Sequence, residues 1–140
     1  MDIAHVVQSS VAPVFLLTGV AATLGVLTNR LARIVDRART LEEQLESHPG
    51  SAQHLQADLA VLARRARYIN FAISLCAIAA LLVALVVVTL FANAFLGSEL
   101  GAVIAVLFVG AMVCLSAAFI TFFIEVRLAT AVLRIGPHRA

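Results

Sequence analysis

Apolar residues recur at alternating steps of four and three over two stretches of the chain. In the first stretch they are Leu27, Leu31, Ile34, Ala38, Leu41 and Leu45. In the second they are Leu55, Leu59, Leu62, Ala66, Ile69 and Ile73. This is the heptad spacing of helices that pack along one apolar stripe. The pattern therefore predicts two helices, each with a single apolar stripe that we call its seam.

The two seams are mirror images, because the numbers of opposed positions such as Leu45 and Leu55 always sum to 100. Pro49 and Gly50, near the centre of this symmetry, favour a turn. Ser51 is a plausible N-cap for the returning helix. We therefore expect an antiparallel helical hairpin with one seam against the other.

Three runs of the chain contain no Asp, Glu, Lys or Arg: Val6 to Asn29, Tyr68 to Ser98 and Leu100 to Ile124. Each run exceeds the roughly 20 residues that a helix needs to cross a bilayer. In agreement, 62% of the residues are hydrophobic and the mean hydropathy is +1.03. The expected fold is an all-α membrane protein with three transmembrane helices and a coiled-coil-like hairpin formed by extensions of the first two.

Within this single membrane domain, we expect an interfacial segment at 1–12, spans at 13–29, 68–95 and 100–124, a hairpin at 30–67 and a tail at 125–140. Pro13 should begin the first span or kink it, because proline cannot donate to the carbonyl of Ser9. No proline or glycine lies between Thr28 and Ser47. The helix of the first span should therefore continue to Glu46, beyond the membrane surface.

The arginines indicate an orientation and a partner. All ten basic residues are arginines, and they lie in residues 30–67 or after residue 126. Since loops rich in Lys and Arg stay cytoplasmic, we expect the hairpin and C-terminus inside and the N-terminus outside. Anionic lipid headgroups are the expected partners. Nucleic acid is not expected, because the seven hairpin arginines lie among five acids with only Tyr68 as an aromatic.

One face of the first span collects small and polar residues. The candidate positions are Gln8, Thr18, Ala22, Gly25 and Asn29. Small residues let membrane helices approach closely. This face is therefore expected either to pack against another helix or to line a pore at the centre of a homo-oligomer.

A second group of candidates lies at the predicted inner boundary of the membrane. It comprises Arg30, Arg33, Arg37, Arg64 and Arg67. These side chains are expected to contact lipid phosphates or to surround a cytoplasmic mouth. Glu125 stands close to hydrocarbon, so it should pair with an arginine. Arg33 is the candidate partner, with Arg30 and Arg67 as alternatives.

Three common catalytic motifs are absent from the sequence. The sequence has no HExxH, no glycine-rich phosphate loop and no nucleophile beside a base, so an enzyme is not expected. No cofactor or metal is expected either. Cys76 and Cys114 both fall within spans and are interpreted as small apolar side chains.

Three strings together resemble a family of small bacterial membrane proteins known as the domain of unknown function 2721 family. They are PVFLLTG at 13–19, LTNRLARIVDRAR at 27–39 and FFIEVR at 122–127. The second string is the most specific, and the resemblance covers nearly the whole chain. It implies a bacterial inner-membrane protein with three helices, and it implies no reaction, ligand or partner.

Two classes of function follow. In the first, several copies assemble with the first spans innermost and conduct small ions. In the second, the protein is a non-conducting scaffold or accessory subunit whose hairpin binds a partner. The direction in which Thr18, Ala22, Gly25 and Asn29 point distinguishes the two.

Overall fold

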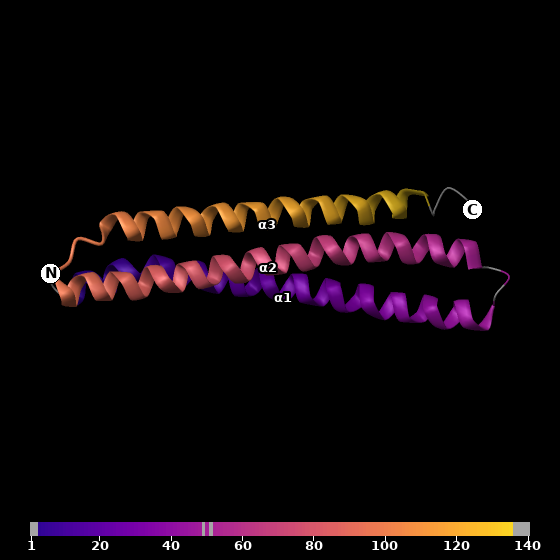
Figure 1. The fold of residues 1–140 in the computed structure, drawn as a ribbon, viewed down its shortest axis with the longest axis horizontal. Coiled ribbons are helices and arrows are strands. Elements are labelled where there is room, and N and C mark those ends of the chain that lie inside the picture. Colours follow the sequence, from indigo (N-terminus) through magenta and orange to yellow (C-terminus); the bar gives the residue numbers. More distant parts are fainter. Residues whose placement is uncertain (1–2, 49, 51, 136–140) are drawn as a thin grey trace. The chain divides into compact units, whose positions relative to one another are not determined.

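The computed structural model describes residues 3–48, 50 and 52–135, with side chains described up to Thr130. It contains the helices α1 (Ile3–Ser47), α2 (Ala52–Leu96) and α3 (Gly101–Ile135) (Figure 1). Within the described residues there is no strand, and the all-α fold class is confirmed. Each helix is long and apolar enough to cross a membrane, by length and composition. The chain is therefore an integral membrane protein.

The first helix extends further in both directions than its apolar run. It begins at Ile3, so Pro13 lies inside it and does not begin it. A proline removes one backbone hydrogen bond, and membrane helices tolerate this loss because neighbouring groups compensate. At the other end α1 continues to Ser47, which confirms the predicted extension beyond the apolar run. Ser51, the expected N-cap of the returning helix, lies outside the described residues.

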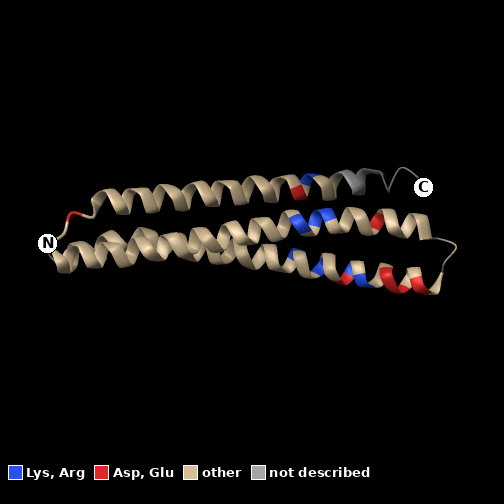
Figure 2. Ribbon diagram, viewed as in Figure 1, with Lys and Arg blue, Asp and Glu red and all other residues tan. Residues whose placement is uncertain are grey.

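The chain divides into two compact units. The first unit comprises Met1–Gly25 with Ser74–Ala118, and the second comprises Val26–Ile73 with Phe119–Ala140. Figure 2 shows that the charged residues of α1 and α2 lie in the parts of these helices near the turn that connects them. These parts belong to the second unit, which therefore holds the candidate charged sites.

The predicted seams form the core of the second unit. The buried positions are Leu27, Ile34, Leu41, Leu55, Leu62 and Ile69. The alternate positions are half-buried: Leu31, Ala38, Leu45, Leu59, Ala66 and Ile73. Every predicted seam residue is thus at least partly covered, as the hairpin requires. The residue-by-residue pairing of the two seams stays a prediction.

The seven-residue spacing begins well before the hairpin. The buried residues of α1 that follow this spacing are Val6, Pro13, Val20, Leu27, Ile34 and Leu41. A seven-residue step is close to two helical turns, so these side chains share one face. The heptad pattern is therefore a property of the whole helix, including its apolar part.

In the first unit, a tight connection joins α2 to α3. Gly97 has a φ of 63°, a conformation that suits glycine, and its N–H donates to the carbonyl of Asn93 at 3.2 Å. The Asn93 side-chain oxygen accepts a hydrogen bond from the N–H of Leu100, also at 3.2 Å. Asn93 thus closes the end of α2 and fixes the chain just before α3.

Candidate functional site

A fully buried carboxylate lies in the second unit and is held by two arginines. The Oε2 atom of Glu125 accepts hydrogen bonds from Arg30, at 2.6 Å from the terminal nitrogen and 3.0 Å from Nε. Its Oε1 atom accepts a hydrogen bond from Nε of Arg65 at 3.0 Å. Arg30 belongs to α1, Arg65 to α2 and Glu125 to α3. One carboxylate therefore joins all three helices of this unit; we call these residues the Glu125 cluster.

The heptad pattern places these charged residues on the buried side of their helices. Glu125 follows the buried Ala118 by seven residues. Arg65 precedes the buried Ala72 by the same step. Because seven residues make almost two full turns, each charged side chain continues a line of buried small ones. Burial of an unpaired carboxylate in such a position would cost several kcal/mol, about as much as desolvation of one ion, and the two arginines offset this cost here.

The partner of Glu125 differs from the predicted Arg33. Arg33 is exposed, and among the described residues it forms no ion pair. It stands three residues after Arg30, so it points about 60° away around the helix axis. Arg30 was an expected alternative, whereas Arg65 was not expected. The signal for Arg65 is its spacing of seven from a buried alanine, which the exposed Arg67 lacks.

One aromatic ring lies against Arg30 of the Glu125 cluster, and a second arginine–aromatic pair lies on α3. The Cζ atom of Arg30 lies 5.4 Å from the centroid of the Phe122 ring. Arg127 is placed similarly over Phe123, at 5.5 Å. These are cation–π distances, which favour a cation in a partly desolvated position. In the part of the chain that the structure describes, no buried side-chain nitrogen or oxygen lacks a hydrogen-bond partner.

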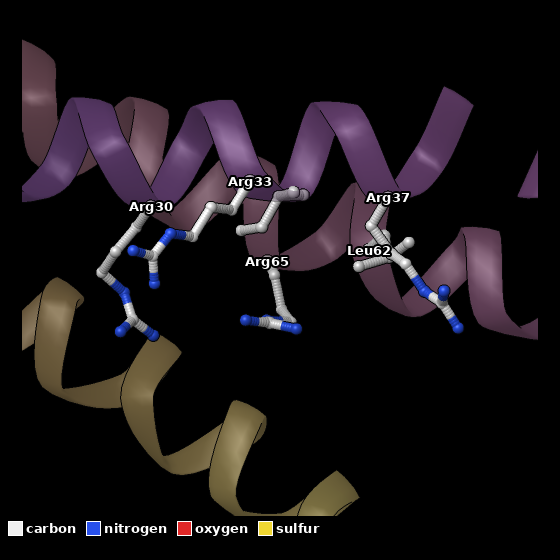
Figure 3. A pocket seen from close by; sticks show the side chains of 6 residues that line it. Arg30, Arg33, Arg37, Leu62 and Arg65 are labelled. Atoms are coloured by element: carbon white, nitrogen blue, oxygen red, sulfur yellow. The ribbon is translucent and has the colours of Figure 1, made fainter. Parts of the chain in front are cut away.

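Beside the Glu125 cluster, a cavity of about 230 Å³ opens in the second unit (Figure 3). Its lining consists of Arg30, Arg33, Arg37, Arg65, Ile34 and Leu62. Three of the predicted boundary arginines thus lie at one cavity, and Arg65 joins them. Arg64 and Arg67 are exposed and do not line it. This cavity is strongly cationic, and we call it the arginine cavity.

The proposed pore face of α1 is exposed along its whole length. Gln8, Thr18, Ala22, Gly25 and Asn29 are all exposed. The hydroxyl of Thr18 donates to the carbonyl of Val14 at 3.3 Å, within its own helix. Apart from its chain neighbours and the nearby backbone of its own helix, a Cβ atom added at Gly25 would meet no atom within 4 Å. The five candidate residues are therefore accessible at the surface of the chain.

The described residues include no group of three or more His, Cys, Asp or Glu that could hold a metal ion. Cys76 and Cys114 are free; the first is buried and the second half-buried. Across the described part of the chain, the features with evident chemical capacity are therefore the Glu125 cluster, the arginine cavity and the exposed face of α1.

Comparison with known proteins identifies a family and gives no activity. Residues 10–135 match the family described as protein of unknown function, DUF2721. Neither the curated proteins nor the solved structures gave a match. The matched region contains the Glu125 cluster, the arginine cavity and most of the exposed α1 face. The three apolar helices fit such a three-span protein, and the chain belongs to the DUF2721 family of proteins of unknown function.

Proposed function

We propose that the protein assembles into a homo-oligomer in the membrane, with α1 of each copy facing the centre, and that the assembly conducts small ions. The observation that supports this proposal is the exposure of the whole face formed by Gln8, Thr18, Ala22, Gly25 and Asn29. The opposite face of the same helix, with Val6, Val20 and Leu27, is buried.

The exposed face is poorly suited to lipid. Thr18 lies within the expected span, where hydrocarbon offers its hydroxyl no hydrogen bond beyond the one to Val14, and Gln8 and Asn29 lie near the two ends of that span. Ala22 and Gly25 leave room for a second helix to approach closely. Copies of α1 around an axis satisfy both conditions, because their small residues allow contact and their polar residues face a water-filled centre.

We propose that the second unit faces the cytoplasm and that the membrane is the bacterial inner membrane. The support for this orientation is the position of the arginines, which lie in residues 30–67 or after residue 126. Such segments are retained on the cytoplasmic side. In this orientation the exposed Arg33 and Arg37 lie at the cytoplasmic boundary of the membrane.

A non-conducting scaffold is the second candidate. It is favoured by the exposed acidic residues near the turn of the hairpin, which present a surface to a partner. They are Glu42, Glu43, Glu46 and Asp58. Oligomers without ion flux would favour this candidate over a channel.

The test compares ion flux through two matched variants in liposomes. Ala22→Leu enlarges a residue of the exposed α1 face, and Ala105→Leu makes the same change on the exposed surface of α3. We expect the parent protein to pass small ions, Ala22→Leu to reduce the flux severalfold and Ala105→Leu to preserve it. Flux no greater than that of protein-free liposomes would refute conduction. Top-view images of the purified particle give the number of copies and show whether α1 is central.

A further inference from the structure

The arginine cavity concentrates positive charge in a way that the ion pairs of the Glu125 cluster do not balance. Four arginines line the cavity and one carboxylate pairs with two of them, which leaves a net charge of four minus one, or three positive. Among the described residues, neither Arg33 nor Arg37 forms an ion pair. We propose that the cavity binds a phosphate group, carried by an anionic phospholipid headgroup or by a free phosphate ion.

The arrangement of the arginines suits phosphate. Arg30, Arg33 and Arg37 stand three and then four residues apart on α1, so they share one face of that helix. Figure 3 shows Arg30, Arg33 and Arg65 extending to the same side of α1, with Arg37 further along the helix. A guanidinium group presents a planar fork of N–H donors that fits two phosphate oxygens at once.

The size of the cavity is also adequate. Its volume of about 230 Å³ far exceeds the roughly 10–15 Å³ that a single water molecule requires. Ile34 and Leu62 provide an apolar part of the wall, against which the carbon atoms of an ester substituent would pack. Glu125 holds Arg30 and Arg65 from the side of α3, so it acts as a positioning residue and not as a ligand.

The position of the cavity along α1 favours contact with the headgroup layer of the membrane. Arg30 directly follows Asn29, the last residue of the uncharged run of α1. Arg37 lies seven residues further, about 10 Å along the helix. The headgroup layer on each side of a bilayer is roughly 5–8 Å thick. With the apolar runs in hydrocarbon, the cavity lies at the level of lipid phosphates and is also open to the aqueous phase.

The first experiment uses double variants that keep the total charge. Arg33→Lys with Arg37→Lys changes the cavity, and Arg39→Lys with Arg67→Lys changes two exposed arginines outside it. Lysine preserves general attraction to anionic surfaces but not bidentate binding. Native mass spectrometry of each protein with phosphatidylglycerol, and with phosphatidylcholine for comparison, measures bound lipid. We expect phosphatidylglycerol to bind at least tenfold more weakly to the cavity variant and equally to the parent and the other variant.

The second experiment distinguishes the two sources of phosphate. Inorganic phosphate is titrated into lipid-free protein in detergent, and the rise in Tm is recorded. A loss of lipid binding in the cavity variant assigns the site to a headgroup. A loss of the phosphate-induced Tm rise alone assigns it to free phosphate. If the two double variants behave alike with both ligands, the proposal is wrong.

Tm values without ligand control for folding. Because Arg33 and Arg37 are exposed and outside the Glu125 cluster, we expect values close to that of the parent. If the cavity double variant unfolds, Arg33→Lys and Arg37→Lys are compared singly with Arg39→Lys. None of these measurements depends on ion flux, so their outcome is independent of whether the protein conducts.

Discussion

The Nε atom of Arg65 lies 3.0 Å from Oε1 of Glu125, and this ion pair links two residues that are 60 positions apart in the sequence. Arg30 occupies the other oxygen of the same carboxylate. The Glu125 side chain is 0% exposed, whereas those of Arg30 and Arg65 are 30% and 21% exposed. The acid is thus the buried member of the cluster, and it depends on both arginines for compensation.

Glu125→Gln should therefore destabilise the protein strongly. Removing one partner of a buried ion pair typically costs about 3–5 kcal/mol, because the remaining charges stay partly buried without compensation. Thermal unfolding in detergent should show a clearly lower Tm. Glu99→Gln, at an exposed residue between α2 and α3, serves as the control and should leave Tm nearly unchanged. Equal Tm values for both variants would mean that the cluster does not stabilise the fold.

Arg64 and Arg65 offer a matched pair of neighbouring arginines. Arg65 donates to Glu125, whereas Arg64 is exposed. Arg65→Gln should lower the stability by about 1–3 kcal/mol, since it removes a hydrogen bond to a buried charged group. Arg64→Gln should stay within about 0.5 kcal/mol of the parent. Denaturant unfolding measures both, and a larger effect at Arg64 would contradict the observed pairing.

The seam of the hairpin can be tested at Leu41, which is 3% exposed. Leu41→Asp places a charge in the seam and should destabilise the hairpin by about 3 kcal/mol, with a loss of helical circular dichroism. Val35→Asp makes a related change on the exposed side of the same helix, where Val35 is 40% exposed. Its effect should remain within about 1 kcal/mol. Unchanged stability in Leu41→Asp would exclude the seam as a source of stability.

Two glycines should respond in opposite ways to alanine. Gly97 has a φ of 63°, so Gly97→Ala should cost roughly 1–2 kcal/mol through backbone strain. At Gly110 an added Cβ would lie 3.6 Å from Cδ1 of Leu82, which is an ordinary contact. Gly110→Ala should therefore be neutral or stabilise α3 by up to about 1 kcal/mol. The order of the two Tm values checks this; a lower value for Gly110→Ala would contradict it.

The parts of the fold that depend on periodicity were predictable from the sequence. The hydropathy of three uncharged runs indicated the helices, and the steps of four and three indicated the seams. The start of α1 at Ile3 was not predictable from Pro13, because a proline inside a helix and one at its first turn leave the same local sequence. Whether α1 continues on the N-terminal side of Pro13 depends on the groups that surround the helix there.

The sequence indicated that Glu125 pairs with an arginine, but it did not indicate which arginines are the partners. The position of Glu125 at the end of an apolar run indicated that it is paired, yet six arginines were available on two helices: Arg30, Arg33, Arg37, Arg64, Arg65 and Arg67. The choice of Arg30 and Arg65 depends on which side of each helix faces α3. For Arg65 and Glu125 that information was present in the spacing of seven from Ala72 and Ala118, whereas no such spacing marks Arg30.

The Glu125 cluster also has a consequence for α3 itself. An apolar helix packed only against other apolar helices can rotate about its axis or shift along it with little change in energy. A carboxylate whose two oxygens are taken by separate neighbours removes this freedom, since any turn or slip breaks at least one bond. The two ion pairs of Glu125 therefore fix the rotation and the axial position of residues 119–130 of α3 relative to the base of the hairpin, until heat or a mutation breaks them.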